Sequence, residues 1–400
     1  MSEAVAPGGA GAGGELKKPR QRDLSMDYLR TTLTLMVLGH HSSLAYTTFA
    51  HFSVNPVTHA IDMTAPVVDT ARWSFFDYAE NFNDVFFMTL MFFVSGVFVY
   101  SALKRHGTLE FIRDRFLRLG VPFAVVVALW MPVAYYAMWQ RTGMDRGYWD
   151  FYKHLAARGF AVGPPWFVWL LLFFDVLLAL AALPVRRWLP RVGRWMGRLG
   201  EHPVAAFVAL FFLSAIAYLP LLARFGFGTW MNLITSPFSF QISRVALYAL
   251  WFVLGFLVGI PGLDAGLLAR NGALARHWKV WLWVCIVAYN ALIFLPKLGG
   301  HWSHAEPLLW VASCVASCFG FLAMFRGMEL HARGWMNSLT RCAYIMYLVH
   351  YTYVLWLQRL MMHAQVWAGV KFLVVFPATV LLSWLTAKAL LKVPGLKAIL

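Results

Sequence analysis

Hydrophobic side chains fill about ten separate stretches of this 400-residue chain, and each stretch is close to 20 residues long. A helix of about 20 residues spans the hydrocarbon core of a bilayer, and continuous apolar runs favour helices over the alternating strands of a barrel. The pattern therefore predicts an all-α polytopic membrane protein with about ten transmembrane helices, of which the first and ninth are the most polar. The predicted spans are 30–50, 84–103, 120–139, 166–185, 203–222, 241–260, 278–296, 307–325, 340–361 and 370–390.

Composition and charge support a membrane location. Hydrophobic residues make up 60% of the chain and charged residues only 13%, whereas a soluble domain averages about 25% charged residues. The net charge of +16 raises the alternative of nucleic-acid binding, but the basic residues lie in short loops between apolar spans. With a cytoplasmic N-terminus, 22 lysines and arginines face the cytoplasm and seven face the other side, as the positive-inside rule requires. We therefore predict cytoplasmic termini, a lipid bilayer as surroundings and no nucleic-acid partner.

The span pattern divides the chain into three segments. Residues 1–22 include a Gly- and Ala-rich run and are predicted to form a disordered cytoplasmic tail. Residues 23–394 form the predicted transmembrane domain, and 395–400 a short cytoplasmic tail. The longest exterior segment, 51–83, contains His and Asp residues, but their spacing matches no metal-ligand pattern. We expect a solvated or folded-back loop there and no metal site.

The first span carries ionisable side chains within an apolar helix. Arg30 and His41 are 11 residues apart, which is close to three turns, so they share a helix face about 16 Å apart. Because ionisable groups are costly in hydrocarbon and mark functional sites, His41 is a candidate catalytic base. A structural histidine bonded to a neighbouring helix is an equal alternative. His40 points about 80° away, and we interpret it as structural. Asp27 precedes Arg30 by three residues. Three interpretations are open: Asp27 lines the same site, pairs with a cation, or stabilises the helix dipole.

A group of arginines follows the second span: Arg113, Arg115 and Arg118. Guanidinium groups hold phosphates in bidentate geometry, although loop arginines usually only satisfy the positive-inside rule. Arg30 is predicted to lie at the same membrane surface. Together, these four arginines are predicted to hold a nucleotide-like polyanion at the cytoplasmic end of the helix face that leads to His41.

Two other spans contribute candidates. In the ninth span, Tyr347 lies on a polar face that His350 borders, and both lie about 9 to 14 Å into the span. Polar residues at that depth face the bundle interior or a wet cavity. Trp166 opens the fourth span from the exterior. An interfacial anchor is the ordinary interpretation of tryptophan there, and stacking on a sugar is the alternative.

Four ordered segments resemble the acyltransferase 3 family of integral membrane O-acyltransferases. They are D-Y-L-R (27–30) with His41 eleven residues after its arginine, F-F-V-S-G-V-F (92–98) followed by R-D-R-F-L-R-L-G-V-P (113–122), P-W-F-V-W-L-L (165–171) and C-A-Y-I-M-Y-L-V-H (342–350). Thr31 and Ala343 depart from the family pattern, which commonly has glycine and serine at these positions. The His40–His41 doublet, with no soluble domain after the last span, resembles the glucan-biosynthesis protein C subgroup, which succinylates periplasmic glucans.

The resemblance implies a membrane O-acyltransferase of the bacterial inner membrane. Such an enzyme moves an acetyl or succinyl group from cytoplasmic acyl-CoA to a hydroxyl of an extracytoplasmic glycan. Acyl-CoA is then a donor substrate, and no tightly bound cofactor is implied. By carry-over, the catalytic candidates are His41 and His350. The candidates for acyl-CoA binding are Arg30, Arg113, Arg115 and Arg118, and those for lining the cavity are Asp27, Tyr347 and Trp166.

A multi-pass transporter that carries an acyl group or a glycan without covalent transfer is the alternative function. Such transporters usually show internal repeats and helices broken in mid-span. The chain shows no clear repeat, although Pro132, Pro220 and Pro377 interrupt apolar runs. For a succinyl group, one further cation is expected in the site, and Arg244 or Arg359 could supply it.

Overall fold

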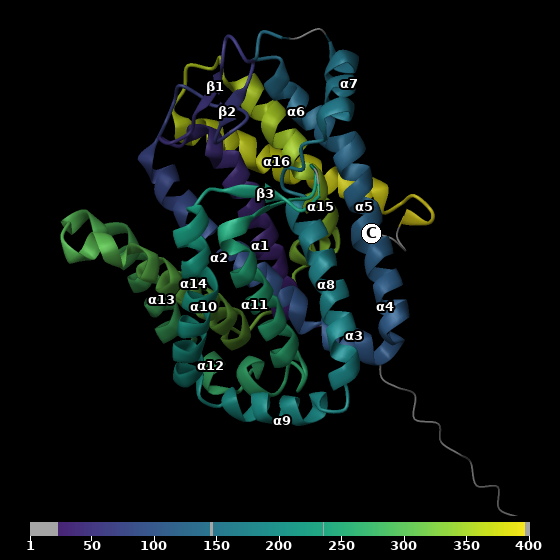
Figure 1. The fold of residues 1–400 in the computed structure, drawn as a ribbon, viewed down its shortest axis with the longest axis vertical. Coiled ribbons are helices and arrows are strands. Elements are labelled where there is room, and N and C mark those ends of the chain that lie inside the picture. Colours follow the sequence, from purple (N-terminus) through teal and green to yellow (C-terminus); the bar gives the residue numbers. More distant parts are fainter. Residues whose placement is uncertain (1–22, 145–146, 235, 397–400) are drawn as a thin grey trace, which may run out of the picture.

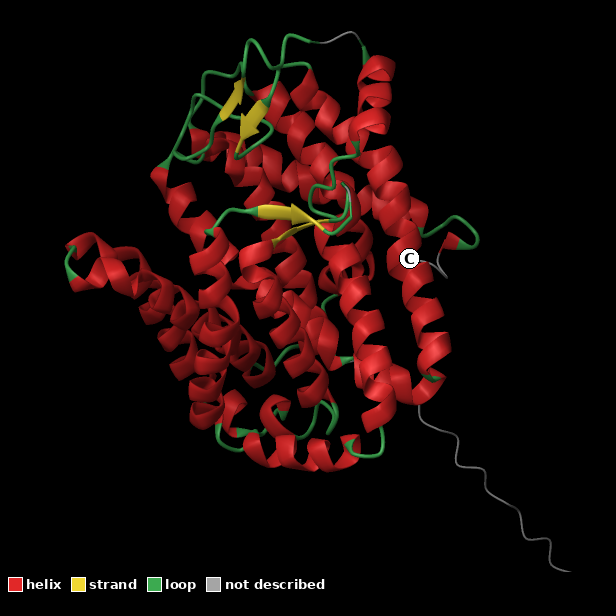
Figure 2. Cartoon of the chain, viewed as in Figure 1, coloured by secondary structure: helices red, strands yellow, loops and turns green. Residues whose placement is uncertain are grey.

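Helices make up most of the computed structural model, which describes residues 23–396 apart from 145, 146 and 235 (Figure 1, Figure 2). The long helices are α1 (Leu24–Ser43), α2 (Ser74–Val97), α8 (Trp166–Val185), α10 (Pro203–Phe225), α11 (Ile242–Gly259), α13 (Trp278–Phe294), α14 (His301–Gly327), α15 (Gly334–Met361) and α16 (Ala368–Leu390). The shorter ones are α3 (Val99–His106), α4 (Thr108–Arg115), α5 (Val121–Val125), α6 (Met131–Trp139), α7 (Tyr148–Arg158), α9 (Leu189–Leu199) and α12 (Ala273–Arg276). Two antiparallel hairpins join β1 (Phe52–Val54) to β2 (Ile61–Met63) and β3 (Trp230–Asn232) to β4 (Ser239–Gln241). The predicted tail 1–22 and residues 397–400 lie outside the described residues.

Eight helical stretches in the described part of the chain are long and apolar enough to cross a membrane. They are Ser74–His106, Thr108–Trp139, Trp166–Val185, Pro203–Phe225, Ile242–Gly259, Trp278–Leu298, His304–Gly327 and Ala368–Leu390. These stretches coincide with eight predicted spans and confirm an all-α polytopic membrane protein. The other two predicted spans correspond to α1 and α15, which have 20 and 28 residues and carry more polar side chains. The total of ten crossings and the cytoplasmic termini stay predictions.

Helix α1 lies in the middle of the bundle (Figure 1). It contacts α2, α14, α15 and α16. Leu29, Leu33 and Val37 are buried along one side at four-residue spacing, which matches one face of a helix. A helix that also carries histidines is stable within a membrane when its polar face meets other protein groups rather than lipid, and this central position provides that environment.

The first turn of α1 is fixed to α14. Asp23 caps the helix, since its carboxylate accepts hydrogen bonds from the backbone N–H groups of Ser25 at 3.1 Å and Met26 at 3.2 Å. The buried guanidinium of Arg326 lies 2.6 Å from the other carboxylate oxygen. Burial by itself would raise the pKa of Asp23, but the hydrogen bonds from Ser25 and Arg326 outweigh it and lower this pKa to about 2.

The last turn of α1 is fixed to α15. The side-chain amide of Gln358 donates to the carbonyl oxygens of His41 at 2.9 Å and Ser42 at 3.2 Å. A helix end leaves its last carbonyl groups without intrahelical donors, so Gln358 satisfies two of them. Both ends of the histidine-bearing helix are therefore held by neighbouring helices.

Helices α2 and α11 pack backbone against backbone. A Cβ atom at Gly255 would lie 2.1 Å from the carbonyl oxygen of Phe93, and one at Gly96 would lie 2.1 Å from that of Phe252. Small residues permit this close approach between membrane helices. The contact fixes the position of α2, which forms one wall of the site described below.

The predicted exterior loop 51–83 is partly folded back onto the helices. Residues after β2 return to the bundle, where Lys371 of α16 lies 2.7 Å from a carboxylate oxygen of Asp69, with both side chains 1% exposed. Helix α2 then begins at Ser74, well before the predicted span boundary at residue 84. The predicted boundary lies too late in the chain because the first turns of α2 are polar. Asp77 in the first turn interacts favourably with the positive end of the helix dipole.

The stretch from α4 to α6 contains two π-helical turns, Phe116–Gly120 and Val126–Trp130. Pro122 has no N–H group, so the carbonyl of Arg118, four residues earlier, loses its helical donor. The hydroxyl of Tyr344 in α15 donates to this carbonyl at 2.8 Å. This hydrogen bond ties the arginine-bearing turn to α15.

Candidate active site

A cavity of about 520 Å³ lies among α1, α2, α8, α15 and the arginine-bearing turn. A second cavity, of about 870 Å³, adjoins it and reaches α3 and the segment after α11. Asp27, Phe98, Arg115 and Arg118 line both cavities. We call the two spaces the arginine cavity and the outer cavity. Their shared wall places the two cavities side by side at the end of the bundle where α1 begins.

Positive charge dominates the arginine cavity. Its lining includes four guanidinium groups and two carboxylates, from Arg30, Arg115, Arg118, Arg341, Asp27 and Asp175. Nε of Arg115 lies 3.3 Å from one oxygen of Asp175, and the other oxygen of Asp175 is buried without a hydrogen-bond partner among the described residues. The Arg30 guanidinium lies 5.5 Å from the centre of the Phe98 ring. An enclosed space with this charge balance attracts a polyanion.

Arg113 is separated from the other predicted arginines. Its side chain is exposed and lines neither cavity, whereas Arg115 and Arg118 line both. Residues 113 and 115 project about 200° apart on a helix, so one of them turns away from the bundle. Arg341 of α15 lines the arginine cavity and Arg105 of α3 lines the outer cavity. Loop position alone did not distinguish these two from other basic residues.

The inner end of the arginine cavity is formed by α8 and α15. Tyr347 lines it, and its hydroxyl donates to the carbonyl of Pro164 in the turn before α8. Trp166 lines neither cavity, since its ring packs 5.6 Å from that of Trp230 in β3. The next residue, Phe167, lines the arginine cavity instead. Successive helix residues point about 100° apart. Phe167 therefore faces the arginine cavity, and its neighbour Trp166 faces away from it.

His41 and His350 face each other beyond this inner end. Their ring centroids are 5.3 Å apart and their planes are inclined by 30°. Neither ring lines the arginine cavity. Thr34 and Tyr347 do line it, and they precede the two histidines by about two turns and one turn of helix, respectively. Arg30, Thr34 and His41 therefore run along α1 from the cavity toward the histidine pair.

One ring nitrogen in each histidine of the pair has no hydrogen-bond partner within the described part of the chain. Nδ1 of His350 lies 2.7 Å from the carbonyl oxygen of Tyr347. Because a carbonyl only accepts, Nδ1 carries the hydrogen, and Nε2 is the acceptor nitrogen of the neutral ring. Nε2 of His350 and Nδ1 of His41 are buried without a hydrogen-bond partner among the described residues. Such atoms are rare in folded proteins, and a catalytic role is one explanation for them.

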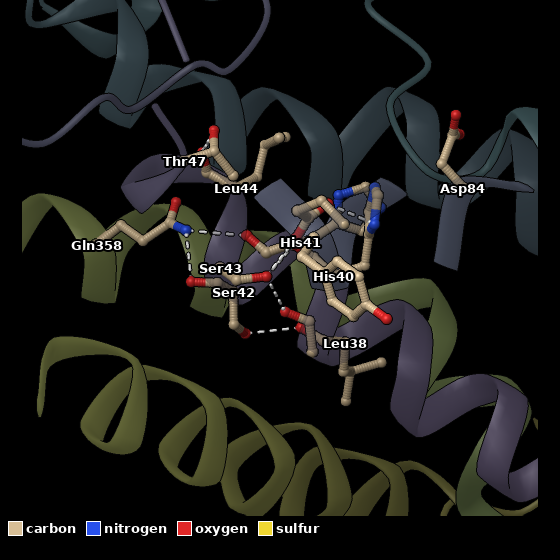
Figure 3. A network of polar contacts seen from close by, with 12 residues as sticks. Leu38, His40, His41, Ser42, Ser43, Leu44, Thr47, Asp84 and Gln358 are labelled. Atoms are coloured by element: carbon tan, nitrogen blue, oxygen red, sulfur yellow. Dashed lines mark hydrogen bonds and ion pairs between the residues drawn. The ribbon is translucent and has the colours of Figure 1, made fainter. Parts of the chain in front are cut away.

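His40 makes different contacts, with α2. Its Nδ1 lies 2.5 Å from Oε2 of Glu80, whose side chain is 2% exposed. The hydroxyl of Ser43 donates to the other oxygen of Glu80. Figure 3 shows His40 and His41 side by side at the end of α1, with Gln358 reaching α1 from α15. Glu80 was missed from the sequence because its segment was assigned to the exterior loop. Extending the helical pattern back from Asp84 by one turn would have found it.

Arg244 is held by another carboxylate of α2. Its Nη1 and Nη2 atoms lie 2.8 and 2.6 Å from the two carboxylate oxygens of Asp84. The rings of Phe227 and Trp310 lie within 5.1 Å of its guanidinium carbon. Because this bidentate pair already occupies the guanidinium, the expectation that Arg244 meets a succinyl carboxylate does not fit the structure. Arg359 lines neither the arginine cavity nor the outer cavity.

Comparison with known proteins identifies the family of the chain. A family model described as an acyltransferase domain matches residues 23–388. No curated protein matches the chain, and neither does any solved structure. The matched range contains all four resembling segments, both cavities and the histidine pair. The chain therefore belongs to the acyltransferase 3 family and is a membrane acyltransferase.

Proposed function

We propose that this protein transfers an acyl group from cytoplasmic acyl-CoA to a hydroxyl group of an extracytoplasmic glycan. The observation that carries the proposal is the arrangement of the arginine cavity, in which several cations lie near the start of α1 and a histidine pair lies beyond the inner end. The donor itself has phosphates at one end and a thioester at the other, joined by a flexible arm. The cations of the site therefore match the phosphates of the donor, and the histidines farther in match the thioester at its other end.

The arginines are proposed to hold the donor at its phosphates. Arg30, Arg115 and Arg118 line the arginine cavity, and charge-assisted contacts from guanidinium to phosphate are among the stronger hydrogen bonds in proteins. The outer cavity provides space for the nucleotide. Arg115 and Arg118 belong to a segment that the positive-inside rule assigns to the cytoplasm, the compartment that contains acyl-CoA. Arg30 lies in the first predicted span, near its cytoplasmic end.

The histidine pair is proposed to act at the thioester end. The arm of the donor would pass Thr34 and Tyr347, which line the inner part of the arginine cavity, and bring the acyl carbonyl to His41. From Arg30 to His41 the helix rises about 16 Å. His41 then serves as a base or as an acyl carrier, and His350 fixes its orientation from 5.3 Å away. Acetyl and succinyl groups are the proposed acyl groups, and a bacterial inner membrane is the proposed location.

Acyl transfer in membrane vesicles tests the proposal. Inverted vesicles that contain the wild-type protein or the His41→Ala variant, at equal membrane levels, are incubated with radiolabelled acetyl-CoA or succinyl-CoA. We expect labelled glycan with the wild type and none above background with the variant, because the loss of a catalytic base or nucleophile removes most of the rate. The better donor identifies the acyl group.

Two results would contradict the proposal. Equal labelling by both proteins would exclude His41 as a catalytic residue. No labelling from either donor by the wild type would exclude acyl-CoA-dependent transfer to glycan. Vesicles with the exposed substitution Arg113→Gln, at a residue outside both cavities, serve as the matched control and should label glycan as the wild type does.

A further inference from the structure

The buried pair formed by His40 and Glu80 has no role in the function proposed above. Nδ1 of His40 lies 2.5 Å from Oε2 of Glu80, and the two side chains are 14% and 2% exposed. A buried carboxylate in a membrane protein is costly and marks a functional site by default. Two other pairs of histidine and carboxylate, His51 with Asp62 and His106 with Glu110, lie on exposed side chains. The pair on α1 and α2 therefore differs from them in its environment.

A histidine held at Nδ1 by a carboxylate has the geometry of a general base. The 2.5 Å contact between Nδ1 of His40 and Oε2 of Glu80 is an ion-pair contact, and neither atom makes a hydrogen bond of standard geometry with any described residue. A carboxylate at this distance stabilises the protonated ring, and with a proton on Nδ1, Nε2 is the nitrogen that accepts a further proton. Among the described residues, no hydrogen bond to Nε2 of His40 is observed, and 14% of the side chain is exposed. His41 and His350 have no carboxylate partner in the described part of the chain. Of the three clustered histidines, His40 is thus the one whose protonated ring a neighbouring carboxylate stabilises.

We propose that His40, oriented by Glu80, is the base that removes the proton from the acceptor hydroxyl, while His41 serves the acyl donor. This inference rests on the proposed function. The rings of His40 and His41 have centroids 5.2 Å apart and planes inclined by 80°, so one reacting carbonyl can lie against both rings. In this division of roles, His40 is a catalytic residue and Glu80 is a positioning residue.

The proposed step conserves atoms and charge. The acceptor oxygen attacks the acyl carbonyl as its proton moves to Nε2 of His40, and a new ester C–O bond forms. The bond that joins the carbonyl carbon to its carrier, the CoA sulfur or a nitrogen of His41, breaks. The electron pair of this bond stays on the carrier atom. The proton is finally taken up by the thiolate of CoA, so that the products are the acyl ester and free CoA. No oxidant or metal ion takes part.

A separate cavity adjoins the pair. It has a volume of about 290 Å³ and is lined by Gly39 and Ser43, on either side of His40 in α1, and by Ala79, which precedes Glu80 in α2. It shares no lining residue with the arginine cavity. Neither His40 nor Glu80 lines this cavity, but an acceptor in it would lie beside the turn of α1 that carries His40 without passing the arginines. The cavity therefore offers the acceptor a route to this turn that differs from the route of the donor.

Paired acceptors test the inference in the same vesicles. One is the glycan hydroxyl, which must lose a proton as it attacks, and the other is hydroxylamine, whose nitrogen attacks without a base. Glu80→Gln and His40→Gln are each expected to lower kcat for the glycan about 100-fold and to leave KM for acyl-CoA within about twofold. Both variants should form acyl hydroxamate at nearly the wild-type rate, after subtraction of the protein-free rate. Glu80→Asp, which keeps the carboxylate, should restore part of the glycan activity.

Double substitution and a surface control complete the test. Because a dyad acts as a unit, the double variant should be no slower than the slower single variant. Asp62→Asn, which breaks the exposed pair with His51, should behave as the wild type. Glycan transfer that survives Glu80→Gln would overturn the inference, and equal loss with both acceptors would show a structural role. A wild type that labels neither acceptor would instead overturn the proposed function.

Discussion

Arg118→Gln is expected to weaken the binding of acyl-CoA, whereas Arg113→Gln is not. The two substitutions remove the same charge from the same segment, but only Arg118 lines the arginine cavity and the outer cavity. A hydrogen bond to a charged group contributes about 1.5 to 3 kcal/mol. Because 55% of the Arg118 side chain is exposed, solvent screening favours the lower part of that range. Since 1.4 kcal/mol is a factor of ten, we expect Kd to rise about 10- to 30-fold.

Equilibrium binding of radiolabelled acetyl-CoA to the purified proteins measures this difference. The Arg118 pair with Asp114, at 3.3 Å with both side chains 55% exposed, contributes little to stability, so its loss should leave the fold intact. The difference between the two variants should shrink as salt is raised, since exposed charges are screened. An equal rise in Kd for both variants would refute the assignment of the phosphate site to the cavity. So would a change of less than twofold for Arg118→Gln.

Two further substitutions test the packing that holds the site. Gly255→Leu should prevent α2 and α11 from packing, because even a Cβ would lie 2.1 Å from the Phe93 carbonyl oxygen. Size-exclusion chromatography should show loss of the monodisperse protein, and Gly197→Ala, with open space around it, should not. Lys371→Met leaves the Asp69 carboxylate buried and unpaired, and should destabilise the protein by about 3 to 5 kcal/mol. A lowered Tm that Asp69→Asn largely restores in the double variant would agree, and an unchanged Tm would not.

Hydrophobic periodicity was sufficient to locate most of the helices. The eight apolar stretches agree with the predicted spans because crossing a bilayer requires a length and a composition that the chain displays directly. The same reasoning placed the start of α2 too late, at residue 84 instead of Ser74, since a helix can extend beyond the apolar run. The shared face of Arg30 and His41 also followed from the sequence, because it depends only on the helical repeat.

Contacts between distant segments decided which of the candidate side chains come together in the site. The sequence offered three equivalent arginines after the second span, and only the orientation of the helix turn separates Arg113 from Arg115 and Arg118. Tertiary packing likewise paired Arg244 with Asp84, 160 residues away.

By itself, the sequence determined the class of protein, the approximate spans and the helix face that carries Arg30 and His41, because each depends on local composition or on the period of a single helix. Only the tertiary structure decided what those side chains meet. His41 faces His350 of α15, and His40 faces Glu80 of α2. Such pairings depend on how rigid helices pack against one another, and no local pattern along the chain specifies that packing.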